Sequence, residues 1–255
     1  MIMRTAVVAM LVAMPVVAGA APSCRATSGD VLRPIVELYT SEGCDSCPPA
    51  DRWLTGTFGD PGQRAIPLAF HVDYWDRLGW KDRFADARYT ERQHVAAAAN
   101  GKTFVYTPQV LVQGRDTRWQ DARPLPGLAG AAPRAVVTLD ATRAADGVHV
   151  VASARVDDRA LRDGATVAIA YVESGLVSDV KAGENRGARL MHDHVVRAFA
   201  TGASRDADGR LTASATFPRT RESGTQPTLV AFVQRPSTGD VLQAVALPLT
   251  DCLPP

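Results

Sequence analysis

The sequence predicts two parts in succession, an α/β domain followed by an all-β, sandwich-like domain. The first part is predicted because strand-like apolar runs alternate with helical patterns from residue 34 to about residue 120. The second is predicted because seven short strand-like runs follow from residue 135, punctuated by Gly and Asp and without helices between them. A stretch rich in Pro and Gly, residues 123–133, is the expected boundary.

The elements of the first part, residues 31–122, follow the order strand, helix, strand, helix, strand. Strand-like runs cover residues 35–39, 66–72, 104–106 and 109–112, and helical patterns cover 47–57 and 83–100. In the second part, residues 134–250, the strand-like runs cover residues 135–139, 148–156, 166–172, 194–200, 211–217, 228–234 and 241–247. We therefore expect a parallel or mixed sheet first and a β-sandwich after it.

The N-terminus has the pattern of a signal peptide over residues 1–20. Arg4 gives a basic start, residues 6–18 are apolar, and Ala18-Gly19-Ala20 supplies the small residues of a cleavage site. The apolar run is too short to span a bilayer, so no stable membrane insertion is expected after cleavage. We expect a periplasmic or secreted protein.

The composition is that of an ordinary globular protein, with 46% hydrophobic and 22% charged residues among 255. The formal net charge is +1, and charges of both signs are mixed along the chain. A nucleic-acid partner, which would require a basic stripe, is therefore not expected.

The sharpest chemical feature is the pair Cys44 and Cys47, which lies where a strand passes through a turn into a helix. A helix N-terminus lowers the pKa of the first cysteine, and the i,i+3 spacing brings the two sulfurs together. This predicts a thioredoxin-like redox pair, with Cys44 as the nucleophile and Cys47 as the resolving thiol. Asp45 opposes thiolate formation, and Pro48 and Pro49 remove two backbone donors, so the direction of electron flow stays open.

Two other uses of the pair stay open on these residues alone. One is a permanent structural disulfide. The other is a copper site built from Cys44, Cys47 and His71, since thiolates and imidazole suit Cu(I). A zinc site would normally show a second Cys or His pair at matching spacing, and none is evident. The redox assignment is preferred and implies no resident metal and no cofactor.

Two further cysteines, Cys24 and Cys252, lie near the two ends of the chain. In an oxidising compartment such a distant pair forms a structural disulfide that joins the termini. Two free or separately used thiols are the alternative.

Three blocks of the sequence resemble a family of secreted bacterial thioredoxin-like proteins of unassigned function. These blocks are VELYTSEGCDSCPPAD at residues 36–51, HVDYWDRLGWKD at 71–82 and YTPQ at 106–109, with a weaker match around 183–197. The resemblance implies a thioredoxin-like domain with a helical insertion at residues 75–101, followed by a β-rich module. It implies no particular activity.

In thioredoxin-like proteins a cis proline faces the cysteine pair, and Thr107-Pro108 matches that position. His71 and Asp73 follow the second buried strand, where they would act as a proton relay for Cys47. Their alternative role is to cap the next helix or to satisfy buried backbone groups. His192 and His194 alternate on an expected strand and would share a face, where a metal site is a further possibility.

The resulting prediction is an exported thiol-disulfide oxidoreductase that acts on protein thiols or disulfides and exchanges electrons with a redox partner protein. The alternative is a copper-binding thioredoxin-like protein that uses the same cysteines. A third is a non-enzymatic adaptor that has lost catalysis, which the retained Cys44, Cys47 and Thr107-Pro108 disfavour.

Overall fold

The structure is a computed structural model that describes residues 23–58, 65–121, 130–218 and 227–250. The expected signal peptide, most of the expected boundary stretch and Cys252 lie outside the described residues. None of the described helices is long and apolar enough to cross a membrane.

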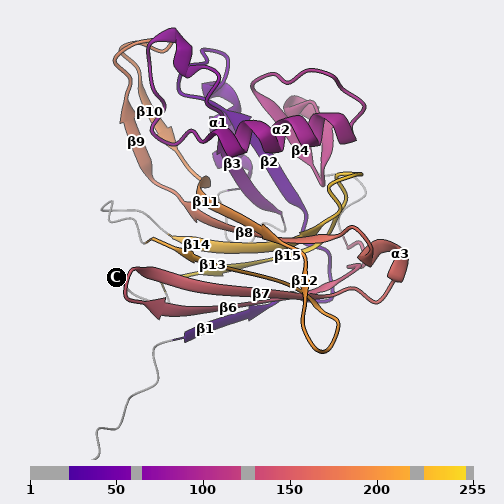
Figure 1. Ribbon diagram of the computed structural model, residues 1–255. Helices are drawn as coiled ribbons and strands as arrows, with labels where there is room; N and C mark the ends of the chain where they lie inside the picture. Colours follow the sequence, from indigo (N-terminus) through magenta and orange to yellow (C-terminus); the bar gives the residue numbers. More distant parts are fainter. Residues whose placement is uncertain (1–22, 59–64, 122–129, 219–226, 251–255) are drawn as a thin grey trace, which may run out of the picture.

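The N-terminal elements follow the predicted order closely (Figure 1). They are β1 (Ser23–Thr27), β2 (Ile35–Thr40), α1 (Pro48–Phe58), β3 (Ile66–His71), η1 (Asp76–Leu78), α2 (Ala87–Ala99), β4 (Gln109–Val112), β5 (Arg115–Thr117) and η2 (Trp119–Asp121). Helix α1 tolerates Pro48 and Pro49 because the first N–H groups of a helix have no partner within it. Helix α2 begins later than predicted because the Asp86 side chain accepts a hydrogen bond from Arg88 N and caps it.

Residues 104–106, predicted as a strand, are not one. This segment leads into Pro108, and the carbonyl of Tyr106 accepts a 2.8 Å hydrogen bond from the Gln93 amide of α2. A side chain thus takes the acceptor that a neighbouring strand would use.

The C-terminal elements include all seven predicted strands, now β6, β7, β8, β11, β13, β14 and β15. In order the elements are β6 (Val136–Ala144), β7 (Gly147–Arg155), α3 (Arg159–Arg162), β8 (Thr166–Glu173), β9 (Leu176–Asp179), β10 (Arg189–His192), β11 (Val195–Gly202), β12 (Ser204–Arg205), β13 (Leu211–Phe217), β14 (Thr228–Gln234) and β15 (Val241–Pro248).

The predicted fold class, a thioredoxin-like α/β domain followed by an all-β domain, is wrong. An eight-stranded sheet, ordered β15-β14-β8-β11-β3-β2-β4-β5, runs through both halves of the chain. Its two halves join where β11 pairs with β3 in parallel at Val195 and Ala69, and the Ala69 N–H donates to His194 O at 2.8 Å. All six residues of β3 are buried, as is typical of a strand in the interior of a sheet that is covered on both faces. The result is a mostly β protein with one central sheet.

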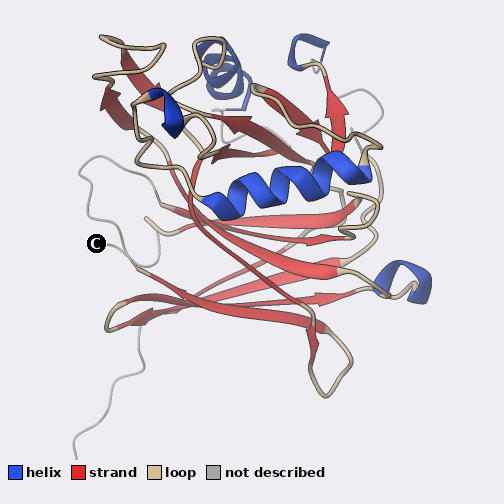
Figure 2. Ribbon diagram, turned by 45° about the horizontal axis from the view of Figure 1, so that its top comes forward, coloured by secondary structure: helices blue, strands red, loops and turns tan. Residues whose placement is uncertain are grey.

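The two faces of the β2–β3 region carry different helices. Val36 and Leu38 of β2 pack in a cluster with α1, whereas Ile35 and Tyr39 pack in a cluster with Tyr89 of α2. Since successive strand residues point to opposite faces, α1 and α2 cover opposite sides of this part of the sheet. Figure 2 shows α2, the long helix, lying across the strands.

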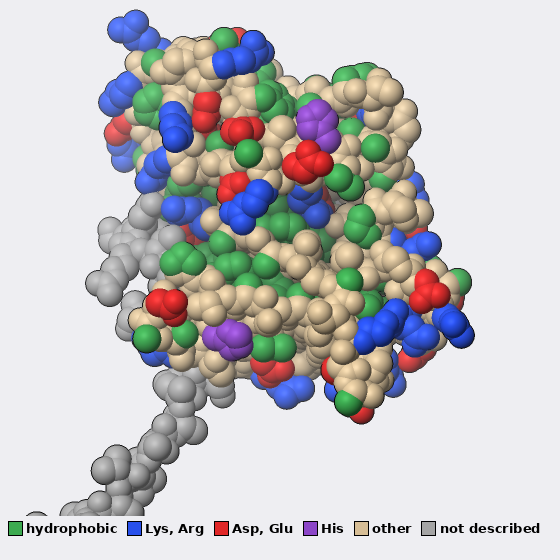
Figure 3. Space-filling model, viewed as in Figure 1, with side chains coloured by type: hydrophobic (Ala, Val, Ile, Leu, Met, Phe, Trp, Pro, Cys, Tyr) green, Lys and Arg blue, Asp and Glu red, His purple; other side chains and the backbone are tan. Residues whose placement is uncertain are grey.

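A second sheet, ordered β1-β6-β7-β13-β12, packs against the β8-β14-β15 end of the first. The largest apolar cluster lies between them and contains residues from both sheets, such as Val150 of β7 and Ile169 of β8. Figure 3 shows hydrophobic side chains gathered across the middle of one face, where the part with α1 and α2 meets the lower strands.

The large sheet is curled. Its β4–β5 turn contacts its β14–β15 turn, although these strands lie near opposite ends of the strand order. A Cβ atom added to Gly114 would lie 1.8 Å from Gly239 O, and Arg115 forms a 2.9 Å ion pair with Asp240.

Candidate functional site

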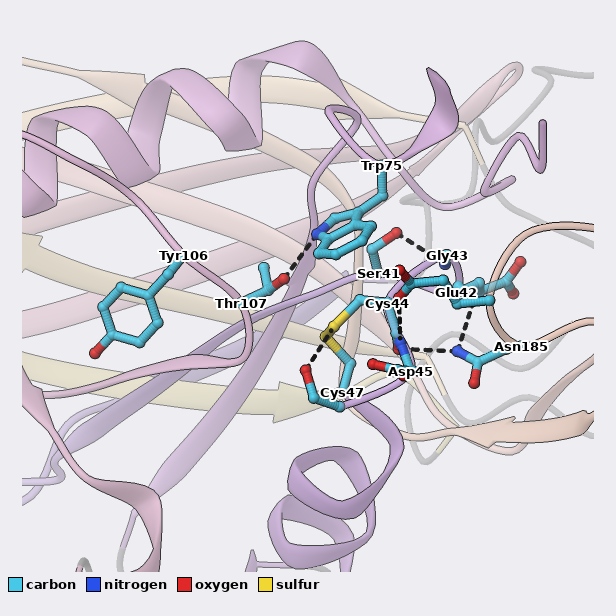
Figure 4. The surroundings of a disulfide bond; sticks show 12 residues. Ser41, Glu42, Gly43, Cys44, Asp45, Cys47, Trp75, Tyr106, Thr107 and Asn185 are labelled. Atoms are coloured by element: carbon cyan, nitrogen blue, oxygen red, sulfur yellow. Dashed lines mark hydrogen bonds between the residues drawn. A yellow bond between two sulfur atoms is a disulfide. The ribbon is translucent and has the colours of Figure 1, made fainter. Parts of the chain in front are cut away.

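Cys44 and Cys47 form a disulfide at the junction of β2 and α1, with their Cα atoms 5.4 Å apart (Figure 4). Both residues are fully buried, while Asp45 and Ser46 between them are exposed. The Cys47 carbonyl accepts hydrogen bonds from the N–H groups of Ala50 and Asp51, so Cys47 directly precedes the first turn of α1. The Ser46 hydroxyl lies 3.4 Å from Cys44 Sγ. The pair therefore lies at the helix N-terminus that the sequence predicts.

The Thr107–Pro108 peptide is cis, as predicted. The indole Nε1 of Trp75 donates a 2.7 Å hydrogen bond to Thr107 Oγ1. On its other side Trp75 adjoins the cysteine turn, because a Cβ atom on Gly43 would lie 3.1 Å from Trp75 Cβ. Figure 4 shows Trp75 and Thr107 beside the disulfide. Trp75, which is half-buried, thus links the cis peptide to the turn that carries Cys44.

His71, at the end of β3, forms a buried pair with Asp82. Its Nδ1 lies 2.7 Å from Asp82 Oδ2, which also accepts a 2.9 Å hydrogen bond from Glu42 N. Burial alone would lower the pKa of His71, but the Asp82 carboxylate, together with the charges of Asp51 and Glu42, outweighs burial and raises this pKa. Burial alone would raise the pKa of Asp82, but His71 and the backbone N–H groups of Glu42 and Phe84 together reverse that shift and lower this pKa. The pair therefore favours an imidazolium beside a carboxylate.

Glu42, two residues before Cys44, is the second buried carboxylate of the site. It accepts a 2.7 Å hydrogen bond from Trp80 Nε1, and His192 Nε2 lies 3.2 Å from its other oxygen. Burial opposes ionisation of Glu42, but His192, together with other donors, lowers its pKa. The rings of His71 and His192 are in edge contact, with centroids 5.2 Å apart. Glu42, Asp82, His71 and His192 thus form one buried charged cluster next to the cysteine turn.

The two candidate proton-relay residues separate in the structure. His71 belongs to the buried cluster, whereas Asp73 is engaged by α2: the Thr90 hydroxyl donates to Asp73 Oδ1 at 2.6 Å, and Asp73 N donates back to Thr90 Oγ1 at 3.3 Å. Asp51, not singled out from the sequence, lies one turn beyond Cys47. Burial raises the pKa of Asp51, while the charges of His71 and His192 oppose this shift. Its place four residues after Cys47 in the CPPAD motif was the signal for it.

A loop from the distant C-terminal half also reaches the cysteine turn. Between β9 and β10, the Asn185 side chain donates hydrogen bonds to Glu42 O at 2.9 Å and to Cys44 O at 2.8 Å. The neighbouring Glu184 carboxylate accepts a 3.1 Å hydrogen bond from Asp45 N. The sequence showed only a weak block here, and nothing in it indicated contact with the cysteines.

The residues that form this site lie within the match to one protein family. The family described as "Protein of unknown function (DUF1223)" matches residues 35–234. The chain belongs to this family. The DUF1223 match starts at β2 and ends at β14, so it includes the disulfide, Thr107-Pro108, the buried charged cluster and Asn185. Cys24 and Cys252 lie outside it.

Two solved structures resemble this DUF1223 protein. The crystal structure of protein AGR_C_4864 from Agrobacterium tumefaciens is 25% identical, with a TM-score of 0.58 and coverage of 86% of this chain and 96% of that one. HBP35 of Porphyromonas gingivalis is 15% identical, with a TM-score of 0.63 and coverage of 89% and 78%. The likeness to HBP35 concerns the fold alone. No curated protein matches the DUF1223 chain.

The remaining predictions concern residues outside the central site. Cys24 is buried in β1, and its predicted partner Cys252 lies outside the described residues, so this disulfide stays a prediction. The prediction that His192 and His194 share a strand face is wrong, because His192 ends β10 and His194 has a φ of 59° in the turn before β11. Within the described part of this DUF1223 chain, no three His, Cys, Asp or Glu side chains are arranged to hold a metal ion.

Proposed function

We propose that this DUF1223 protein is an exported thiol-disulfide oxidoreductase that acts on protein thiols or disulfides through Cys44 and Cys47. The observation that carries the proposal is that these two cysteines are bonded to each other at the start of α1, beside Thr107-Pro108. A pair that forms and breaks one disulfide is a two-electron couple. The chemistry proposed is of the thioredoxin-like kind, carried on a different arrangement of strands.

In the reducing direction, the Cys44 thiolate attacks one sulfur of a substrate disulfide. A mixed disulfide forms, and the other substrate sulfur leaves as a thiolate. Cys47 then attacks Cys44 Sγ, which releases the second substrate thiolate and closes the Cys44–Cys47 bond. Two electrons pass to the substrate, and the oxidising direction is the reverse. The helix N-terminus and the Ser46 hydroxyl near Cys44 Sγ favour the thiolate that begins this sequence.

The second step requires that Cys47 lose its proton. Asp51 lies one turn further along the same helix, and its raised pKa makes it a better proton acceptor than an ordinary carboxylate. The positive charge favoured on His71 interacts with Asp51. We propose Asp51, with His71 behind it, as the proton relay, in place of the earlier pair His71 and Asp73.

Compartment and partners follow from the same proposal. The signal-peptide pattern at residues 1–20 supports export to the periplasm or outside the cell. A pair that cycles there needs a redox partner protein to restore its starting state after each turnover.

The test compares wild type, Cys44→Ser and Cys47→Ser in insulin-disulfide reduction and in reactivation of scrambled ribonuclease. We expect activity of the wild type in at least one assay and none in Cys44→Ser. Cys47→Ser should instead accumulate a mixed disulfide with substrate, detectable as a mass adduct on Cys44. If the wild type is inert in both assays and its Cys44–Cys47 bond resists reduction at potentials below about −300 mV, the pair is structural and the proposal fails.

A further inference from the structure

The loop between β9 and β10 forms hydrogen bonds with the cysteine turn, residues 42–47. The Asn185 side chain donates two hydrogen bonds to backbone carbonyls of this turn, one to Glu42 O and one to Cys44 O. Figure 4 shows its side chain pointing at these carbonyls. Glu184 accepts a hydrogen bond from Asp45 N. Three hydrogen bonds thus hold Glu42, Cys44 and Asp45 from a loop about 140 positions later in the chain.

The loop is itself well anchored on the side of the turn. Gly183 has a φ of +74°, and a Cβ atom there would lie 3.3 Å from Trp80 Cβ, so the loop approaches closely at a residue without a side chain. Strand β10 ends in His192, whose ring meets Glu42. In the described sheets β9 pairs only with β10, so a displacement of the hairpin would leave the strand pairing of the eight-stranded sheet intact.

The disulfide has no exposed surface in this arrangement, since Cys44 and Cys47 are both 0% exposed. A thiolate has to reach one sulfur from outside before exchange can begin. Because the amide of Asn185 donates a hydrogen bond to the Cys44 carbonyl, the position of the Cys44 backbone depends on this contact. Local opening that breaks it is the route by which the sulfur becomes accessible.

We propose that Asn185 is a positioning residue for Cys44: it holds the cysteine turn closed over the disulfide, and its release exposes Cys44 Sγ to the attacking thiolate. The inference rests on the proposed function only for the identity of Cys44 as the attacked sulfur. In that step a thiolate forms a bond to Cys44 Sγ, the Cys44–Cys47 bond breaks, and Cys47 leaves as a thiolate with the electron pair. With dithiothreitol, its second thiol completes the exchange and the reagent becomes the cyclic disulfide.

The experiment measures the rate at which dithiothreitol reduces the Cys44–Cys47 bond, by acid quench, alkylation and peptide mass mapping, which separates this pair from Cys24. Asn185→Ala should be reduced roughly tenfold faster or more, the factor expected for the loss of two hydrogen bonds. Asn185→Asp keeps the volume but replaces the donor Nδ2 by a carboxylate oxygen that repels the two carbonyls, so its disulfide should be reduced faster still. Arg186→Ala, an exposed neighbour in the same loop, is the matched control and should match wild type.

Equal rates, within twofold, for wild type, Asn185→Ala and Asn185→Asp would overturn the inference. So would acceleration in Asn185→Ala with a wild-type rate in Asn185→Asp, since that result assigns the effect to side-chain volume. If either variant fails to fold by circular dichroism, Glu184→Ala replaces it, with a smaller acceleration expected and an unchanged rate as the contradicting result. The assay needs no protein substrate, so inertness towards insulin would count against the proposed function and leave this inference standing.

Discussion

Trp75 Nε1 donates a 2.7 Å hydrogen bond to Thr107 Oγ1, and this contact joins the segment after β3 to the cis peptide before β4. The two segments flank the disulfide from the same side (Figure 4). Together with the antiparallel pairing of β2 and β4, this hydrogen bond sets the position of the cis peptide relative to the cysteine turn.

Removing either partner of this hydrogen bond should lower the free energy of unfolding. Thr107→Val keeps the side-chain volume and removes the acceptor, and we expect it to lower the free energy of unfolding by about 1 kcal/mol. Trp75→Phe removes the donor and some packing, so its cost should be somewhat larger. Denaturant unfolding of both variants and of the double variant measures the coupling. A double variant whose cost is the full sum of the two would show that the hydrogen bond contributes nothing.

Replacing only one partner of the buried ion pair between Arg92 and Glu37 should strongly destabilise the protein. Arg92 contacts both Glu37 oxygens, at 2.6 and 3.2 Å, and Glu37 is 1% exposed. Arg92→Met leaves this carboxylate buried without its cation, which costs about 3–5 kcal/mol. Adding Glu37→Gln removes the charge and should restore much of the loss. Denaturant unfolding checks this, and a double variant no more stable than Arg92→Met would contradict it.

Stability should depend on pH through His71 and Asp82. The pKa of His71 is raised above 6.5, so its contribution is complete below that pH and is lost as pH rises through the folded-state value. The pKa of Asp82 is lowered below 3.8, so its contribution is present above that pH and is lost on acidification. The pair should therefore stabilise most between about pH 4 and pH 6.5.

The variant Asp82→Asn isolates this effect. Its destabilisation relative to wild type should be greatest in that window and should shrink as the pH rises from about 6.5 towards the raised folded-state pKa of His71. Urea unfolding at a series of pH values measures the difference. A difference that stays constant from pH 5 to pH 9 would show that His71 is not charged in the folded protein.

Gly114 should not tolerate a side chain. It has a φ of +76°, and a Cβ atom would lie 1.8 Å from Gly239 O, a backbone atom that cannot rotate away. Gly101 is the matched control, since its φ is +70° but nothing lies within 4 Å of its Cβ position. Gly101→Ala should cost about 1–2 kcal/mol from backbone strain alone, and Gly114→Ala clearly more. Thermal unfolding compares the two, and equal costs would mean that the turns separate easily.

The local part of the site could be predicted from the sequence. Cys44 and Cys47 lie between a run that forms a strand and one that forms a helix, and neighbouring residues determine that setting. Thr107-Pro108 could also be placed, through the resemblance to a known motif. These predictions needed only short-range pattern or motif spacing.

What the sequence could not show was long-range contact. Asn185 and His192 reach Glu42 through the β9–β10 hairpin, and no periodicity in residues 176–192 indicates which loop they would cover. The predicted fold class was wrong for the same reason. Val195 pairs with Ala69 in parallel, and the apolar pattern of β3 is equally compatible with any partner strand. His194 was misassigned because its left-handed backbone ends the alternation that residues 192–200 suggest.

The parallel pairing of β3 with β11 also bears on how the chain acquires its structure during synthesis. Strand β3 is made long before β11, so one of its edges stays open while the intervening residues are still being added. Contacts between such distant segments slow folding, and open apolar edges attract other chains. Fragments that end before β11 should aggregate, and the nascent protein should depend on holding chaperones until its last strands have been made.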